Sequence, residues 1–205
     1  MFPLPSTVLF PGTVLPLHVF EPRYRDMVSD ALAGDGSMAV VLERTGVDGR
    51  GMPLVHAVAG GGRIIHAERL ADGRFNILLQ GLSRVRLLDE LPLDRRYRRF
   101  RAEVIAAPTE PELKEAHAEL AKLQSCVLAL RSVVAERDAP MLEVLRSTSD
   151  PLELADILAA SMISSPAVQQ ELLASVNLRA RLAQLVDALA DAMVRMGEPD
   201  GAALN

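Results

Sequence analysis

A proline-rich apolar stretch near the start of the chain, residues 9–24, restricts the fold more than any other segment. It places Pro11, Pro16 and Pro22 among leucines, valines and phenylalanines, and Gly12 follows Pro11. Because proline has no amide hydrogen, such a stretch suits neither a regular helix nor the centre of a β-sheet. We predict two short extended pieces joined by a turn at Pro11-Gly12, the second at a sheet edge or bulge, and a helix that begins at Pro22.

The rest of the first half has the pattern of β-strands around one early helix. Apolar residues at helical spacing predict a helix over Pro22–Leu32, and Asp72-Gly73 predicts a hairpin turn. The glycine-rich residues 45–52 predict a loop. We expect a small, partly closed β barrel of antiparallel strands. The predicted extended segments are 37–43, 53–70, 75–80, 83–87 and 97–105.

The second half of the chain is predicted to be helical. Apolar residues between Leu113 and Val134 recur at steps of three and four, which predicts one long helix, and a second such stripe follows Asn177. Asp150-Pro151 and Ser165-Pro166 are typical helix starts. We predict an all-α bundle of four or five helices. The first stripe could instead serve a coiled coil in a homodimer.

The balance of charge changes where the two patterns meet. Residues 1–107 contain 14 arginines and 12 acidic residues, whereas residues 108–205 contain 15 acidic residues and 8 lysines and arginines. The change falls at residues 107–111, which have the composition of a linker. We therefore predict an α+β protein with two domains, a β-barrel domain over 1–107 and a helical bundle domain over 108–205.

Several chemistries lack the residues that they need. The single cysteine, Cys126, excludes an intramolecular disulfide, and the four histidines have no metal-ligand spacing. No phosphate-binding loop motif occurs. We expect no catalytic residue, no metal and no cofactor. Neither an apolar run long enough to span a bilayer nor a signal-peptide pattern is present, so we expect a cytoplasmic protein with no membrane partner.

The order and spacing of five sequence pieces carry a family resemblance. The first runs from Phe10-Pro11-Gly12 to Phe20-Glu21-Pro22-Arg23-Tyr24, and the second covers residues 72–81. Arg84-Val85-Arg86 follows, and residues 154–159 and 169–173 lie in the helical half. Together they make the chain resemble the amino-terminal, substrate-binding domain of Lon protease, in its stand-alone form without the ATPase and protease parts.

The resemblance implies a PUA-like β barrel followed by a helical bundle. It also implies a non-enzymatic module that binds exposed or unfolded polypeptide segments, or a protein partner, in a groove between barrel and bundle. Unpaired strand edges would supply backbone hydrogen bonds to such a segment. The candidate binding residues are Leu15, Leu17, Glu21, Arg23, Tyr24 and Arg84. An alternative role for the polar residues among them is to lock the first helix to the barrel.

Two other functions compete with protein binding. PUA-like barrels include RNA binders, and the arginine-rich face between Arg84 and Arg101 could contact RNA, although Asp89, Glu90, Asp94 and Glu103 are close enough in sequence to neutralise several arginines. A small-molecule enzyme of unknown type is the second alternative. The run Gly60-Gly61-Gly62 predicts either a strand bulge or a small anion-binding nest.

Overall fold

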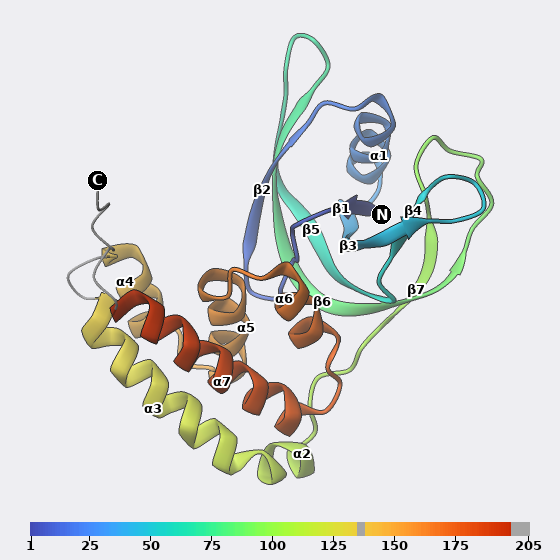
Figure 1. The fold of residues 1–205 in the computed structure, drawn as a ribbon. Helices are drawn as coiled ribbons and strands as arrows, with labels where there is room; N and C mark the ends of the chain where they lie inside the picture. The colour runs from blue at the N-terminus through green and yellow to red at the C-terminus, as the bar shows by residue number, and fades with distance from the viewer. Residues whose placement is uncertain (135–137, 198–205) are drawn as a thin grey trace, which may run out of the picture. The chain divides into compact units, whose positions relative to one another are not determined.

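The computed structural model describes residues 1–134 and 138–197 (Figure 1). Backbone contacts divide them into two compact units. The first comprises Met1–Ala106 with Ser165–Ala174, and the second comprises Ala107–Ser164 with the described residues from Ser175 onward. The helix over 166–174, which the sequence groups with the helical half, therefore packs with the sheet. The rest of the predicted two-domain division stays a prediction.

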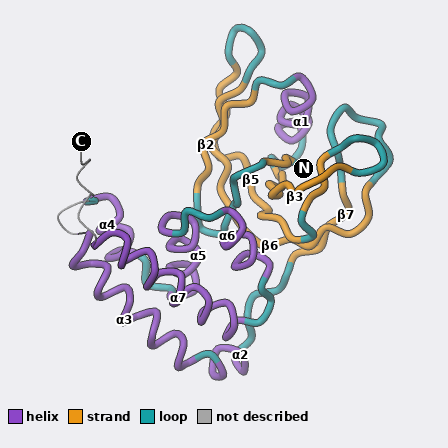
Figure 2. The backbone as a smooth tube through the Cα atoms, in the orientation of Figure 1, coloured by secondary structure: helices purple, strands orange, loops and turns teal. Residues whose placement is uncertain are grey.

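All strands of the described residues lie in the first unit and form one mixed sheet (Figure 2). Paired strands follow the order β1-β3-β5-β6-β2, with β4 added to β3 and β7 added to β6. The β1–β3 pair is parallel and the other pairs are antiparallel. The predicted α+β class is confirmed, with a sheet whose path of paired strands is open. The strands are β1 (Phe2–Leu4), β2 (Val14–Val19), β3 (Ser37–Val47), β4 (Pro53–Val55), β5 (Val58–Arg69), β6 (Phe75–Glu90) and β7 (Phe100–Val104).

The predicted turn at Pro11-Gly12 is present, and the segment before it lies across two glycines. Gly12 has a φ of +78° and its amide donates to the Gly81 carbonyl oxygen over 3.0 Å. Leu9 and Phe10 are fully buried. A Cβ atom on Gly60 would lie 2.0 Å from the Leu9 carbonyl oxygen, and one on Gly81 would lie 2.0 Å from the Phe10 carbonyl oxygen. Only glycine therefore permits this close approach.

The glycine run in β5 lies opposite a strand irregularity. The β5–β6 register shifts between Gly61 and Gly62, because Gly61 pairs with Ser83 and Gly62 pairs with Gly81. The extra residue is Leu82, so the bulge is on β6 and the glycines are its partners. Gly60 pairs with Val40 on β3 and with Arg84 on β6. The run is therefore part of the interior of the sheet.

Pro16 lies in an edge strand, as its missing amide predicts. β2 pairs with β6 and with no other strand among the described residues. The Gly81 amide donates to the Thr13 carbonyl oxygen over 2.8 Å, so the odd-numbered residues of β2 direct their amides to β6. Consequently the nitrogen of Pro16 faces the open edge, where the lack of a hydrogen costs no ladder bond.

Three predicted boundaries in the sheet are wrong. β3 extends to Val47, into the first three residues of the expected loop, because it pairs with β4 across a bulge. β6 continues through Gly81 as one strand, with a bulge at Leu82 where we expected two separate strands. The last strand begins at Phe100 instead of Tyr97, since Phe100 is the first residue of this segment that pairs with β6.

Helix α1 (Pro22–Ala33) begins at the predicted proline and covers one side of the sheet core (Figure 1). Its buried residues are Tyr24, Met27 and Val28. They pack with side chains from four strands and the loop before β2, which gives the first unit its main hydrophobic core. Fully buried members include Leu9, Val28, Val40, Ile77 and Leu79.

Helix α6 (Pro166–Ala174) completes the first unit. Its start is capped weakly by Ser165, whose hydroxyl accepts from the Val168 amide over 3.4 Å. The buried side chain of Gln170 donates from Nε2 to the Val58 carbonyl oxygen of β5 over 2.9 Å. A hydrogen bond from a buried amide to a strand carbonyl ties this helix to the sheet.

The second unit is all-helical. The predicted long helix over 113–134 is divided at Ala116, and a reciprocal capping box of Thr109 and Glu112 starts its first part. Asp150 caps the helix that begins at Pro151, as predicted, and its side chain accepts from the Leu152 amide over 2.8 Å. Leucines of the two predicted stripes are buried in this unit. The helices are α2 (Glu110–Glu115), α3 (His117–Val134), α4 (Ala139–Ser147), α5 (Pro151–Met162) and α7 (Leu178–Gly197).

Candidate functional site

Leu15 and Leu17, two of the predicted binding residues, point into the core of the first unit. Both are half-buried and pack against the hydrophobic core. They pair with Leu79 and Ile77 of β6, which are themselves buried. Because side chains alternate along a strand, the residues between them face the other way. The side chains of Leu15 and Leu17 therefore anchor β2 to the core, and the residues that alternate with them form the outer face of this strand.

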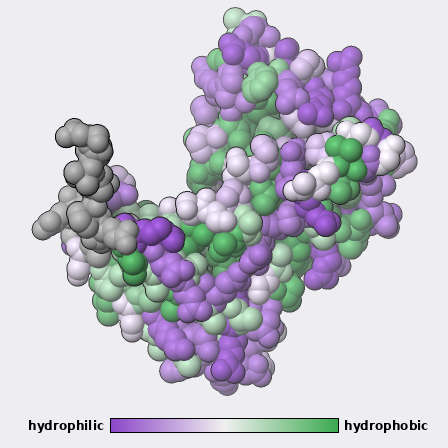
Figure 3. All heavy atoms as spheres, in the orientation of Figure 1, coloured by the Kyte–Doolittle hydropathy of each residue, from purple (hydrophilic) through white to green (hydrophobic). Residues whose placement is uncertain are grey.

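The outward residues of β2 belong to an apolar surface on the outer side of the sheet, which we call the outer patch. Val14 is 48% exposed, and Pro16 is exposed and paired in register with Leu78. On the next strand Ile65 is 52% exposed and lies in a bulge beside the His66–Leu78 pair. Figure 3 shows hydrophobic side chains interrupting the polar surface of this unit. The outer patch consists of Val14, Pro16, Ile65 and Leu78.

Glu21, Arg23 and Tyr24 come together at the start of α1. The Arg23 Nε donates to Glu21 Oε2 over 2.9 Å, and the Arg23 guanidinium lies 4.5 Å from the centre of the Tyr24 ring. The Tyr24 ring packs against Phe2 of β1 with 4.5 Å between ring centres. Burial, above all, raises the pKa of Tyr24. These contacts join α1 to the sheet.

Arg84 lies elsewhere in the first unit. Its Nε donates to the Leu173 carbonyl oxygen of α6 over 3.1 Å. A cation near the end of a helix also interacts favourably with the helix dipole. Arg84 and Gln170 thus both fasten α6 to the sheet.

The arginine-rich face is rich in ion pairs. The four acids singled out in the sequence each contact an arginine: Glu103 lies 3.0 Å from Arg86, and Asp89 lies 4.0 Å from Arg101. Glu90 contacts Arg98 over 2.8 Å, and Asp94 contacts Arg99. Arg95 and Arg96 lie 3.5 and 3.9 Å from Asp30 and Asp26 of α1.

Arg98 is the buried member of this face. It is 7% exposed, and its Nη1 donates to the Pro53 carbonyl oxygen over 2.7 Å. Its hydrogen bonds to Glu90, aided by Arg50, hold the pKa of that carboxyl below its usual range. This arginine therefore fixes the segment before β7 to β4 and β6.

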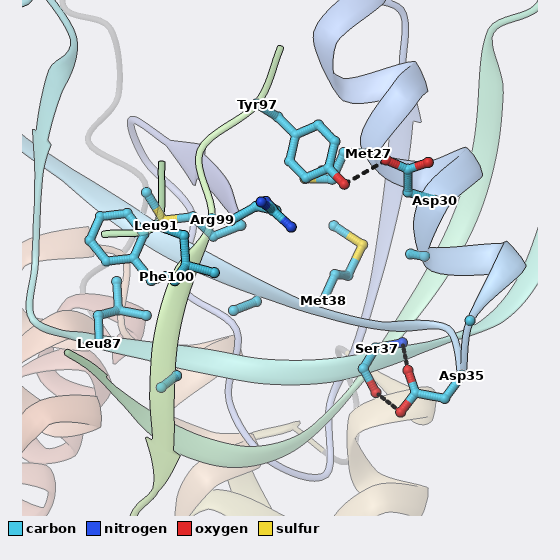
Figure 4. A pocket seen from close by; sticks show the side chains of 15 residues that line it. Met27, Asp30, Asp35, Ser37, Met38, Leu87, Leu91, Tyr97, Arg99 and Phe100 are labelled. Atoms are coloured by element: carbon cyan, nitrogen blue, oxygen red, sulfur yellow. Dashed lines mark hydrogen bonds between the residues drawn. The ribbon is translucent and has the colours of Figure 1, made fainter. Parts of the chain in front are cut away.

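A cavity of about 380 Å³, here called the β7 cavity, opens between α1, β3, β6 and β7 (Figure 4). Tyr97 and Asp30 meet at its wall, where the Tyr97 hydroxyl donates to Asp30 Oδ2 over 2.7 Å. Burial and this carboxylate raise the pKa of Tyr97 to about 12. No sequence pattern predicts this cavity, because its walls come from distant segments. Its apolar lining includes Met27, Met38, Leu87, Leu91, Tyr97 and Phe100.

Among the described residues, no group of three or more histidine, cysteine, aspartate or glutamate side chains could hold a metal ion. Within 1–134 and 138–197, no helix has the length and apolar character needed to cross a membrane.

Comparisons with known proteins give the family. The model of the ATP-dependent protease La (LON) substrate-binding domain matches residues 1–191. The chain is similar to Lon protease 2 of Myxococcus xanthus, with 27% identity over 190 residues, which cover 92% of this chain and 23% of that protein. It is 26% identical to Lon protease of Anaeromyxobacter dehalogenans, of which it covers 22%. The chain thus spans about a quarter of the length of these relatives.

Two solved structures share the fold. The N-terminal domain of Mycobacterium avium complex Lon protease is 18% identical, with a TM-score of 0.69 and coverage of 93% of this chain and 96% of that one. A Lon N-terminal domain protein from Xanthomonas campestris is 25% identical, with a TM-score of 0.64 and coverage of 91% and 95%. The chain described here belongs to the ATP-dependent protease La (LON) substrate-binding domain family.

Proposed function

We propose that this chain is a non-enzymatic module that binds exposed, extended segments of other polypeptides through the outer patch. The carrying observation is that an edge strand, β2, presents Val14 and Pro16 to solvent beside Leu78 and Ile65. Membership of a substrate-binding family gives this surface its expected ligand class. When a partner covers apolar surface that was exposed to water, the free energy falls by about 25 cal/mol for each Å² buried.

Pro16 determines how a segment would be held there. Since its nitrogen faces the open edge without a hydrogen, an incoming strand cannot complete a ladder along β2. Binding through the outer patch would therefore depend on side-chain burial, which tolerates many sequences. Such tolerance suits a module that recognises unfolded segments.

The ion pairs of the arginine-rich face favour a polypeptide over RNA as the ligand. Binding to phosphates would have to replace contacts that Arg86, Arg98 and Arg99 already make with carboxylates. An RNA ligand would also bind with an affinity that falls steeply with salt. Measuring binding at two salt concentrations separates the two ligand classes.

The test uses a permanently unfolded, reduced model protein as the ligand. Leu78→Asp should weaken its binding, because a carboxylate in the outer patch would have to be desolvated. Leu88→Asp is the matched control, since Leu88 lies on the same strand with 44% exposure and is outside the patch. Equal affinity of the two variants, or no binding by the folded native chain, would contradict the proposal.

A further inference from the structure

We propose that β7 and the cavity beside it form a second polypeptide site, where one extended strand adds to the free edge of β7 and inserts a single large apolar side chain into the β7 cavity. The proposal shares its ligand class with the proposed function and uses a different surface. Three observations carry it: an unprotected edge, an adaptable apolar cavity next to that edge, and a donor at the cavity wall that lacks an acceptor among the described residues.

The free edge of β7 offers unpaired backbone groups. Among the described strands, β7 pairs only with β6. The Ile105 amide donates to the Arg84 carbonyl oxygen over 2.9 Å, and Glu103 is in register with Arg86, so these two residues direct their backbone groups to β6. The amides of Ala102 and Val104 therefore point to the open edge.

The other outer strands of the described sheet each contain a proline. Pro3 lies in β1, Pro16 in β2 and Pro53 in β4. Proline on an edge blocks strand addition. β7 reads Phe-Arg-Ala-Glu-Val and has none. Its edge is thus the one that the sequence leaves available to an incoming strand.

The cavity lies on the face of β7 that carries Phe100 and Ala102, both of which line it. Arg101 and Glu103 alternate with them and contact Asp89 and Arg86. A strand added to this edge would hence present every second side chain to the cavity. A volume of about 380 Å³ is at the lower end of ligand sites, which suits one or two side chains.

The lining determines which side chain fits. Met27 and Met38 supply flexible thioether side chains that can adjust to different shapes, and Leu91 and Phe100 add apolar surface. Figure 4 shows Met38 across the cavity from Leu91 and Phe100. Leucine, methionine or phenylalanine would bury its surface there, whereas alanine would leave the space unfilled.

Arg99 marks the polar side of the site. Its guanidinium lines the cavity and contacts Asp94 through Nη2, while its Nε is buried and has no acceptor within the described part of the chain. Unpartnered buried donors are costly in folded proteins. With a small change of rotamer, a backbone carbonyl oxygen of the added strand would satisfy this group.

The experiment measures anisotropy of short fluorescent peptides of glycine, serine and threonine with one central leucine, added to the full chain. Replacement of this leucine by alanine should weaken binding about tenfold or more, and so should methylation of the neighbouring backbone nitrogens. Neither change involves the fold of the protein. Unchanged affinity after either replacement would overturn the proposal.

Protein variants place the site. Ala31→Phe fills the cavity from α1 and should weaken binding of the leucine peptide about tenfold. Ala33 is exposed on the same helix outside the cavity, so Ala33→Phe should bind the peptide with native affinity. Ala102→Pro removes one outward amide and leaves the β6 ladder intact, with the same expected loss. Native-like binding by both Ala31→Phe and Ala102→Pro would locate the peptide elsewhere and overturn the proposal.

The outer patch serves to distinguish the two proposals. If Leu78→Asp weakens binding of the unfolded protein and leaves binding of the leucine peptide unchanged, the two ligands use separate sites. If the leucine peptide responds only to Leu78→Asp, the second site is wrong and the proposed function stands. If the leucine peptide binds in the cavity while the unfolded protein ignores Leu78→Asp, the outer patch is wrong and the β7 site stands.

Discussion

The Leu9 carbonyl oxygen lies 2.0 Å from the place where a Cβ atom on Gly60 would stand. This contact joins the proline-rich entry segment to the middle of β5. Phe10 and Gly81 make the matching contact. The two contacts explain why β5 and β6 each contain glycine at the point where the entry segment lies closest to them.

Gly60→Ala should lower the free energy of unfolding by about 1–3 kcal/mol or more, because the added methyl group meets backbone that cannot move aside cheaply. Gly49→Ala is the control, since a Cβ atom there has no neighbour within 4 Å. Urea denaturation followed by circular dichroism measures both. Equal midpoints for the two variants would contradict the contact.

Pro16→Ala should increase self-association while changing the stability of the monomer little. The substitution gives the open edge of β2 an amide donor, and unprotected edges pair with one another. Light scattering across a concentration series measures the effect. Pro5→Ala, outside any strand, should leave the apparent mass unchanged.

Arg98→Met should destabilise the fold by about 1–3 kcal/mol, because the Pro53 carbonyl oxygen and Glu90 lose a buried donor. Arg101→Met removes an exposed contact of 4.0 Å to Asp89 and should change stability by less than about 1 kcal/mol. Thermal unfolding of both variants gives the comparison. A loss for Arg101→Met as large as that for Arg98→Met would argue against a special role for burial.

The tyrosines should ionise above their ordinary range. The chain has two tyrosines and no tryptophan, so ultraviolet absorbance reports them without interference. The folded pKa of Tyr97 is raised to about 12, and therefore its contribution to stability is fully present below pH 10, the unfolded value, and is lost as the pH rises through 12. Tyr97→Phe should remove that part of the alkaline slope, and titration of Tyr97 itself near 10 would contradict its burial beside Asp30.

Local chemistry predicted much of the fold. Pro11-Gly12, Pro16 and Pro22 each marked the element that the structure contains there, because proline limits backbone geometry wherever it occurs. Asp150 marked a helix start for the same kind of local reason. The four acids near the arginines were recognised from sequence proximity alone.

The candidate binding residues stay a prediction, and strand parity explains why the sequence could not place Leu15 and Leu17. They share one face of β2, but the sequence does not say which face is buried when both carry apolar residues. In the structure Leu15 and Leu17 pack against the core, and Val14 and Pro16 are exposed. The packing of α6 on β5, the contact of Leu9 with Gly60 and the β7 cavity all join segments far apart in the chain, which no local pattern records.

The path of the chain has a consequence for dissection of this protein. It leaves the first unit after Ala106, returns for Ser165–Ala174 and leaves again, so three peptide connections link the two units. One proteolytic nick near Thr109 would release neither of them. Likewise, a fragment that stops there would lack the amide of Gln170, and the carbonyl of Val58 would have to find water instead.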